Sequence, residues 1–412
     1  MFIDIFFSIY YTIYIILQNY PNALFIEKER RMKLSNKIIA TLMITAVFSS
    51  NYYTYAAQLN STNQFAKVDL NDAINCADQL HNQVVKINDD SSLEALCKSD
   101  EYEKSFQKLS CNNIIAVYHN EDNYNSIADK LGYQFNVTDD NEKNSANTYC
   151  TLYYYDQDNV PIIHDIDIDQ NWSEKENNEF VNSVVSKVKR EIVETNTNEF
   201  SVAKLMSTSY TTKYLGKYVR SYKNEDISLL EVSYKFYTLQ NYQGNDFYTV
   251  IGTINANPGR AMYDGGDKSY DYDIQGDGLD VSISAENSGH TRVEYGPSRT
   301  VGESSYSYSL GGDWSSSGVS VSGGFSYSQS ISDTDINVNS LPNITTWNVV
   351  LSGEAQKQTC TFSPAITYST SKSAEYAKFY VDTKFNTDAW NEFPTYTNIG
   401  KSVVCYPSSI KK

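Results

Sequence analysis

The sequence predicts an α+β N-terminal domain followed by a mainly antiparallel, sandwich-like β domain that carries an amphipathic insertion hairpin. Helical and strand periods are mixed before residue 200, and strand-like segments dominate after it. Acidic charge is concentrated in the first part: residues 58–199 hold 26 acidic and 11 basic residues, a net charge of −15, whereas residues 200–412 hold 21 and 17, a net charge of −4. We therefore place the domain boundary between residues 199 and 200.

The composition excludes two classes of protein. The chain of 412 residues contains 35 Tyr, 17 Phe and 4 Trp, which is too much aromatic surface for a disordered chain. Its formal net charge of −17 argues against a nucleic-acid partner, because phosphate binding needs clustered cations. We expect a folded protein that binds no nucleic acid.

The first residues predict export. Residues 1–31 are Tyr-rich and apolar up to a charged end, and we interpret them as a mis-assigned start. Residues 32–57 have a basic beginning, an apolar run from Ile38 to Phe48 and small residues near Ala56, the pattern of a cleaved signal peptide. An N-terminal membrane anchor is the alternative. We therefore predict that the protein is secreted.

Six cysteines follow this signal. An even number in an exported chain favours disulfides. We expect Cys360 and Cys405 to pair in the β domain. The other four, Cys76, Cys97, Cys111 and Cys150, would pair in the first domain in an order that the sequence leaves open. The chain has no Cys-x-x-Cys motif or Cys/His cluster typical of zinc, and we expect no metal or cofactor.

The first domain, residues 58–199, mixes both periods. Helical spacing runs from Leu70 to Val84 and again over residues 93–97, while Ile114–Tyr118 and Thr151–Tyr155 read as short strands. Ser173-x-x-Glu176 is a capping box that opens a long amphipathic helix ending in a polar linker at residues 194–200.

The second domain, residues 200–412, reads as a succession of strands rich in Tyr, Val, Ile and Thr. We predict strands at Leu229–Leu239, Phe247–Ala256, Leu279–Ala285, Thr345–Leu351 and Ala377–Phe385. We predict turns at residues 257–259, 265–266, 276–278 and 296–297. This pattern favours an antiparallel sandwich or a set of long twisted strands.

Residues 300–336 hold the strictest alternation in the chain. The parity reverses across Ser315–Gly318, as a hairpin requires, and folding about the 316–317 midpoint pairs Tyr308 with Phe325 and Tyr306 with Tyr327. One predicted face, directed to lipid, holds Tyr306, Tyr308, Leu310, Gly312, Trp314, Val319, Val321, Gly323, Phe325 and Tyr327. The other face, directed to a water-filled lumen, holds Ser305, Ser307, Ser309, Gly311, Asp313, Ser320, Ser322, Gly324, Ser326 and Ser328.

Two arms of ten residues, 305–314 and 319–328, match a transmembrane β-strand. At about 3.3 Å per residue and a tilt near 45°, each spans roughly 23 Å, close to the apolar band of a barrel. One hairpin has unpaired edges that lipid does not tolerate, so insertion predicts a closed ring of copies of this chain.

The runs Tyr308–Trp314 and Val319–Ser332 resemble the prestem of the leukocidin/haemolysin β-pore-forming toxins, and Trp347 lies where that family has a Trp after its stem. The resemblance implies a secreted cytolysin that oligomerises on a target membrane and inserts one hairpin per protomer. The cysteines and the acidic first domain depart from that family. Aerolysin-like toxins also use one Ser/Thr-rich hairpin, so the subfamily stays open.

The alternative function is a secreted adhesin or glycan-binding β-sandwich without membrane insertion, because any half-exposed hairpin alternates. The acidic chain attracts anionic lipid weakly, so we expect a neutral headgroup, a glycan or a protein receptor, with residues 390–396 as a contact loop.

The sequence holds two acidic clusters, and we interpret neither of them as a metal or catalytic site. Residues 271–280 predict a polar turn in place of a Ca²⁺ site, because the EF-hand pattern is incomplete. Residues 164–169, with His164 and three aspartates, predict a solvated strand edge in place of a metal or acid/base site. The chain has no hydrolase, metalloprotease or P-loop motif, and we expect no enzyme.

Overall fold

The chain divides into two compact units, residues 1–61 and Thr62–Lys412. A computed structural model describes parts of the second unit. The described residues are 66–67, 83–87, 100–118, 127–128, 130–138, 147–156, 158–168, 172–194, 213–224, 227–242, 245–262, 274–287, 289–298, 305–310, 325–330, 333–371, 376–388 and 395–406. The predicted mis-assigned start and signal peptide lie outside them.

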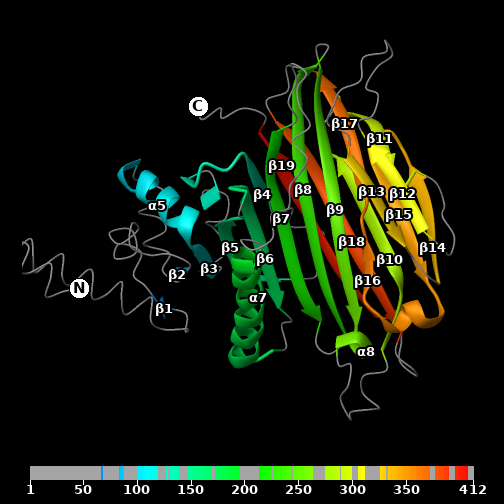
Figure 1. Cartoon of the computed structure of the whole chain (residues 1–412), viewed down its shortest axis with the longest axis horizontal. Coiled ribbons are helices and arrows are strands. Elements are labelled where there is room, and N and C mark those ends of the chain that lie inside the picture. Colours follow the sequence, from blue (N-terminus) through cyan, green and yellow to red (C-terminus); the bar gives the residue numbers. More distant parts are fainter. Residues whose placement is uncertain are drawn as a thin grey trace, which may run out of the picture. The chain divides into compact units, whose positions relative to one another are not determined.

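Strands dominate the described residues, and eleven of them form one sheet, sheet A (Figure 1). In sheet order these are β1 (Ala66–Lys67), β2 (Val84–Ile87), β3 (Ile114–Tyr118), β5 (Asn147–Tyr155), β6 (Pro161–Ile168), β7 (Lys213–Asn224), β8 (Ser228–Tyr242), β9 (Asn245–Pro258), β17 (Ala365–Ser371) and β11 (Thr291–Gly296), with β16 (Cys360–Phe362) also on β9.

Six further strands form sheet B, and two form a separate hairpin. Sheet B runs in the order β14 (Thr334–Ser340), β15 (Ile344–Leu351), β10 (Gln275–Ala285), β18 (Ala377–Asp388), β19 (Thr395–Cys405) and β4 (Phe135–Thr138). The hairpin is β12 (Ser305–Leu310) with β13 (Phe325–Ser330). The helices are α5 (Asp100–Asn112), α7 (Glu174–Glu194), the single turn α8 (Gly259–Met262) and the 3₁₀ helix η3 (Gly353–Lys357).

Each predicted strand of the β domain is present, because its alternating side chains can bury one face. In β18 buried and half-buried residues alternate over most of the strand. One predicted turn is wrong: Gly276–Gly278 lies inside β10, where the register with β18 shifts between Gly276 and Gly278. These glycines mark a bulge within a strand. The break predicted at residues 257–259 is confirmed, since β9 ends at Pro258 and α8 begins at Gly259.

Sheets A and B pack face to face, as the sandwich prediction required. Phe236 of β8 stacks between Phe135 of β4 and Phe379 of β18, with ring centroids 6.2 and 6.3 Å away. The hydroxyl of Tyr368 in β17 donates to the carbonyl of Ile283 in β10 at 3.0 Å. The shared core therefore lies between the two sheets.

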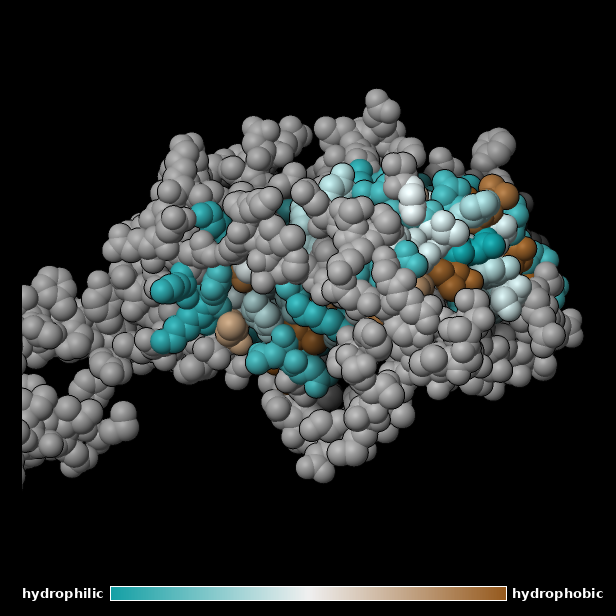
Figure 2. Space-filling view, turned by 90° about the horizontal axis from the view of Figure 1, so that it is seen from above, coloured by the Kyte–Doolittle hydropathy of each residue, from teal (hydrophilic) through white to brown (hydrophobic). Residues whose placement is uncertain are grey.

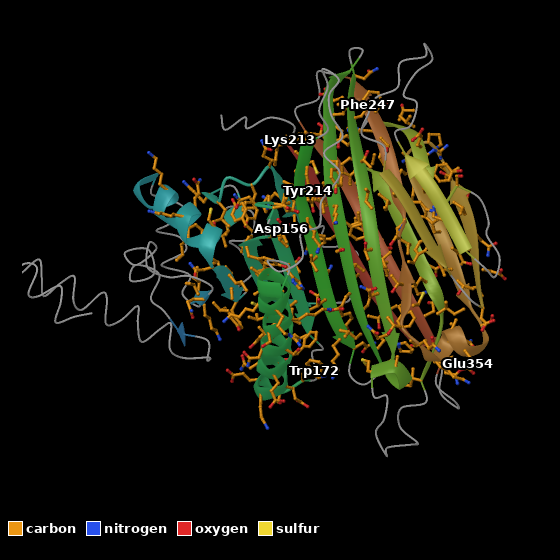
Figure 3. All side chains as sticks on the ribbon, in the orientation of Figure 1. Asp156, Trp172, Lys213, Tyr214, Phe247 and Glu354 are labelled. Atoms are coloured by element: carbon orange, nitrogen blue, oxygen red, sulfur yellow. The ribbon has the colours of Figure 1, made fainter. Side chains whose placement is uncertain are left out.

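The helix α7 covers the opposite face of sheet A, where its valines join the buried side chains of β5 and β6. Its predicted capping box is confirmed: the Glu176 carboxylate accepts from Ser173 N–H at 2.8 Å, and Glu176 N–H donates to Ser173 Oγ at 3.3 Å. Trp172, which is labelled in Figure 3, lies just before the helix, and its ring packs edge-on against that of Phe180. Among the described residues, no helix is both long enough and apolar enough to cross a bilayer.

The structure does not separate the two predicted domains. β6 pairs in parallel with β7, so sheet A continues from the first half into the second, and β4 of the first half pairs with β19 of sheet B. Residues 199 and 200 themselves lie outside the described residues. The charge difference between the halves predicted a boundary wrongly, because charge distribution governs surface behaviour and says little about strand pairing.

The acidic cluster on β6 is not a solvated edge, and this prediction is wrong. β6 lies between β5 and β7, and both Asp165 and Asp167 have no exposed surface. The strand buries both faces, as strands with a parallel neighbour commonly do. The predicted helix ending at Val84 is also wrong at its end, since Val84 begins β2; residues 68–82 and 93–97 lie outside the described part of the chain.

The predicted disulfide between Cys360 and Cys405 is absent, and both thiols are free. Cys360 begins β16 on sheet A, whereas Cys405 ends β19 on sheet B, so the two residues belong to different layers. Cys111 and Cys150 are free as well, while Cys76 and Cys97 lie outside the described residues.

Candidate functional site

The predicted hairpin is present as a two-stranded ribbon that forms a small sheet of its own. Among the described strands, β12 and β13 pair with each other and join neither sheet. Tyr308 lies opposite Tyr327, and Leu310 lies opposite Phe325. The predicted pairs of Tyr308 with Phe325 and Tyr306 with Tyr327 are wrong by two residues. Because the shift is even, the two alternating sets of the prediction still occupy matching register positions.

The ribbon lies in the connection between the two layers of the sandwich. It follows β11, which ends the strand order of sheet A, and precedes β14, which ends the strand order of sheet B (Figure 1). Residues 311–324, which hold the other predicted lipid-facing and lumen-facing positions, lie outside the described residues.

The chain is anchored just before the ribbon. The indole N–H of Trp347 in β15 donates to the main-chain carbonyl of Pro297 at 3.0 Å. Trp347 has no exposed surface, so it forms part of the core of sheet B. Its hydrogen bond fixes the backbone at the end of β11.

A second anchor lies just after the ribbon. The carbonyl of Asp333 accepts from both the N–H and the hydroxyl of Ser352, at 2.8 and 3.0 Å. Ser352 directly follows β15, the strand that also holds Trp347. Both ends of the segment between residues 298 and 332 are therefore attached to one strand of sheet B and its first following residue.

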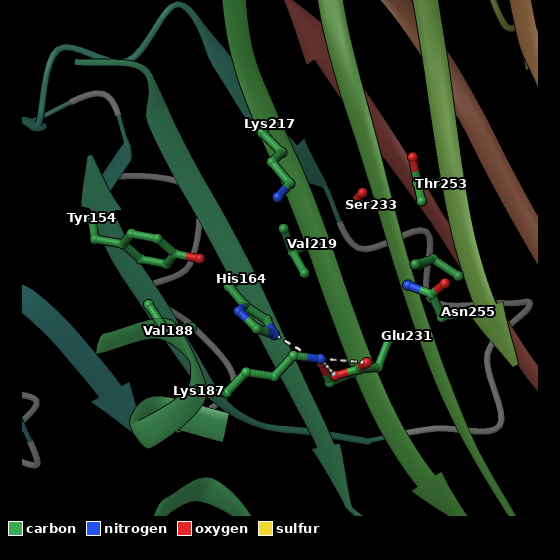
Figure 4. Close-up of a pocket in the computed structure, with 12 residues that line it drawn as sticks. Tyr154, His164, Lys187, Val188, Lys217, Val219, Glu231, Ser233, Thr253 and Asn255 are labelled. Carbon is green, nitrogen blue, oxygen red and sulfur yellow. Dashed lines mark hydrogen bonds and ion pairs between the residues drawn. The ribbon is translucent and has the colours of Figure 1, made fainter. Parts of the chain in front are cut away.

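A second candidate site is a polar pocket of about 110 Å³ on the α7 side of sheet A (Figure 4). Val219 of β7 lies near its centre, and polar side chains surround that residue. Lys217 points in from one end, and Lys187 of α7 meets Glu231 of β8 at the other end. Ser233, Thr253 and Asn255 line the side formed by β8 and β9.

His164 forms the buried wall of this pocket. Its side chain is 5 % exposed, and its Nε2 lies 2.9 Å from the hydroxyl of Ser221. Burial, followed by the positive charges of Lys217 and Lys187, lowers the pKa of His164 to about 3. The imidazole is therefore neutral at physiological pH and acts as a hydrogen-bonding group.

The opposite face of β6 and β7 holds a buried ion pair between Asp167 and Arg220. Arg220 also donates to the carbonyl of Gly400 in sheet B at 2.9 Å. Burial alone would lower the pKa of Arg220, but the Asp167 carboxylate outweighs burial and raises it. Next to this pair, Asp165 accepts from Thr151 at 2.6 Å and from Tyr218 at 2.9 Å. This network joins the two layers of the sandwich.

The remaining predicted sites do not assemble. Asp277 and Asp280 lie on β10, and Asp280 accepts from Asn348 at 2.7 Å; residues 271–273 lie outside the described residues. Within the described residues no group of His, Cys, Asp or Glu could hold a metal ion. Of the predicted contact loop, Tyr396 belongs to β19 and residues 390–394 are outside the description.

The surface seen in Figure 2 is mixed, with hydrophobic residues scattered among hydrophilic ones. The large exposed hydrophobic residues of the described part are Val293, Leu341, Val350 and Tyr376. Scattered single residues of this kind are normal for a protein surface.

Comparison with known proteins gives matches among solved structures alone. No family model matches the sequence, and no curated protein matches it. Among solved structures, one described as a pore forming protein matches with a TM-score of 0.28 and 8% identity, over 48% of this chain and 89% of that one. The delta-toxin of Clostridium perfringens matches with a TM-score of 0.27 and 9% identity, over 49% of this chain and 96% of that one. TM-scores this low carry no argument about the fold or the function of this chain.

Proposed function

We propose that this protein is a secreted pore-forming toxin that oligomerises on a target membrane and inserts the β12–β13 hairpin of each protomer. One observation carries the proposal. Within the described strands, the ribbon hydrogen-bonds to itself and to neither sheet, although its chain connects the two layers. Its release would break no backbone ladder of sheet A or sheet B.

The composition of the segment supports the same function. Within residues 305–314 and 319–328, one set of alternate positions holds Tyr, Leu, Trp, Val, Phe and two Gly, and Ser occupies most of the other set. A strand that faces lipid on one side and water on the other needs apolar residues at one set of alternate positions and polar residues at the other. In the resting protein each strand is six residues long, so the proposal requires both to lengthen into residues 311–324 on insertion. Ten residues per arm would then span roughly 23 Å at the tilt of a barrel strand.

Insertion needs more than one copy. A single hairpin in lipid leaves two edges with unpaired N–H and C=O groups, each costing several kcal/mol. A ring of protomers pairs every edge with the next copy. With a net charge of −17, the chain gains little from anionic lipid, so a neutral headgroup or a receptor is the proposed point of attachment. No enzymatic step is part of the proposal.

The test is leakage of a trapped dye from phosphatidylcholine vesicles, read beside the oligomeric state. Tyr308→Asp places a charge on the predicted lipid face and should abolish leakage, because a charged side chain on the lipid face of a barrel strand destabilises the inserted state in every protomer. Ser309→Asp is the matched control on the predicted lumen face and should leak like the parent. Equal leakage by both variants would contradict the proposal. Saturable glycan or protein binding without any leakage would support the adhesin alternative.

A further inference from the structure

The pocket between α7 and strands β7–β9 has an apolar centre inside a polar rim (Figure 4). Val219 lies in the middle, and amines, a carboxylate, an amide and hydroxyls lie around it. A pyranose ring offers the complementary surface, because its C–H groups cover one face and its hydroxyls radiate from the edge as both donors and acceptors. We propose that this pocket binds a single sugar ring.

The charges of the rim argue against the other small ligands. A bare anion would face Lys187 and Lys217, but it would also meet the carboxylate of Glu231. A divalent cation would be repelled by the two amines. A hydrophobic ligand would leave the rim without water, at a cost for every polar group it covers. The hydroxyls of a neutral polyol can accept hydrogen bonds from the amines and donate them to the carboxylate, so they satisfy rim groups of either charge.

The size of the pocket limits the ligand to one ring. Its volume of about 110 Å³ is well below the roughly 300–1,000 Å³ of pockets that enclose drug-sized ligands. The Lys187 side chain on the rim is about half exposed at 48%, so further sugars of a chain would extend into solvent beside it. The inferred ligand is therefore a terminal sugar residue of a glycan.

Two rim groups are already held in place for this role. The ammonium of Lys187 contacts both carboxylate oxygens of Glu231 at 2.7 and 2.6 Å, which fixes the carboxylate. The hydroxyl of Thr361 donates to Oδ1 of Asn255 at 2.9 Å, and this turns the amide nitrogen of Asn255 toward the pocket (Figure 4). Groups fixed before binding lose less conformational entropy when a ligand arrives.

The pocket also draws on both halves of the chain. His164 and Lys187 come from the first half, while Lys217, Glu231 and Asn255 come from the second. The parallel pairing of β6 with β7 brings them together. A sugar-binding role gives this junction a function that does not depend on the hairpin, and sugar binding can be measured without a membrane.

The experiment uses the purified full chain and four probes: the methyl glycosides of galactose, glucose, mannose and N-acetylglucosamine. Saturation-transfer NMR followed by titration should show saturable binding of at least one probe. Asn255→Leu keeps the side-chain volume but removes the amide, and should weaken that binding at least tenfold. Ser233→Leu fills the pocket from another strand and should do the same.

The matched control is Asn348→Leu, which makes the same change on the outer face of sheet B, where Asn348 contacts Asp280. It should bind like the parent, and all variants should keep the parent's melting temperature within a few degrees. If none of the four probes binds, or if Asn255→Leu and Ser233→Leu bind like the parent, the proposal is overturned. Neither result bears on vesicle leakage, so this proposal and that of pore formation fail separately.

Discussion

Trp347 and Pro297 are 50 positions apart in the sequence, and a hydrogen bond of 3.0 Å joins the indole N–H of the first to the carbonyl of the second. On the far side of the hairpin, Ser352 holds the carbonyl of Asp333. The hairpin segment therefore has two fixed ends, one held by Trp347 within β15 and the other by Ser352 directly after β15. In the proposed function, these contacts limit the movement to residues 298–332 and keep β11 and β14 in place.

The first prediction concerns the anchor at Trp347. Trp347→Phe keeps an aromatic ring but leaves the Pro297 carbonyl without its donor, so we expect a loss of about 1–3 kcal/mol in the free energy of unfolding. Limited proteolysis should also cut within residues 298–332 faster. Trp172→Phe removes the same N–H group far along the chain and should not change cleavage of this segment. Equal cleavage in Trp347→Phe and the parent would show that the anchor does not restrain the hairpin.

The second prediction concerns the buried ion pair. Arg220→Met leaves Asp165 and Asp167 in the core without their cation, and we expect a loss of about 3–5 kcal/mol, measured by urea denaturation. Arg190→Met, at an exposed position of α7, should change stability by less than about 0.5 kcal/mol.

Adding Asp167→Leu to Arg220→Met removes one of the two buried carboxylates that the first change leaves without a cation. The double variant should therefore recover part of the lost free energy of unfolding. A double variant less stable than Arg220→Met alone would contradict this account of the cluster.

The third prediction is a dependence of stability on pH. The folded pKa of His164 is about 3, below its ordinary value of 6.5, so between these values the unfolded chain binds a proton that the folded chain does not. Stability from this group is therefore complete above pH 6.5 and falls as the pH falls toward 3. His164→Gln keeps a group that can reach Ser221 but does not titrate.

Between pH 7 and pH 5 the parent should lose about 2 kcal/mol more than His164→Gln, since one pKa unit corresponds to about 1.4 kcal/mol. Urea denaturation at both pH values measures the difference. Identical losses in the two proteins would mean that His164 is protonated in the folded state well above pH 3.

The fourth prediction concerns the thiols. Cys111 is exposed, whereas Cys150 and Cys405 are buried. Iodoacetamide should therefore label Cys111 in the native protein and reach the other two after unfolding. Burial raises the pKa of Cys111 as well, so labelling should speed up at alkaline pH. A peptide linking Cys360 to Cys405 in a non-reducing digest would contradict the structure.

Every strand that the sequence predicted in the β domain is present, because alternation within a strand is a local signal, but strands such as β7, β17 and β19 were not predicted. Strand partners were not predictable in the same way: β6 pairs with β7 although the two strands lie on either side of the predicted domain boundary, where the acidic excess falls. Arg220 and Asp167 illustrate the difficulty, since charged residues in a strand normally indicate solvent and here face each other in the core.

The candidate sites show the same difference between local patterns, which the sequence predicts, and long-range packing, which it does not. The two alternating sets of the hairpin followed from parity, but its register was wrong by two residues, because register depends on a connection whose conformation the sequence pattern does not determine. The pocket was missed altogether. Lys217, Val219 and Ser221 do alternate with buried residues of β7, a signal that could have identified that strand, but their meeting with Lys187 and His164 depends on long-range packing.

The central claim is tested most directly by an environment-sensitive dye attached to Gly311→Cys and, in a second protein, to Gly323→Cys, each added to phosphatidylcholine vesicles. These positions belong to opposite predicted faces of the inserted hairpin. The account predicts a blue-shifted, brighter emission from position 323 in lipid and a water-like emission from position 311 in the lumen. The same emission from both positions, while the vesicles leak, would contradict it.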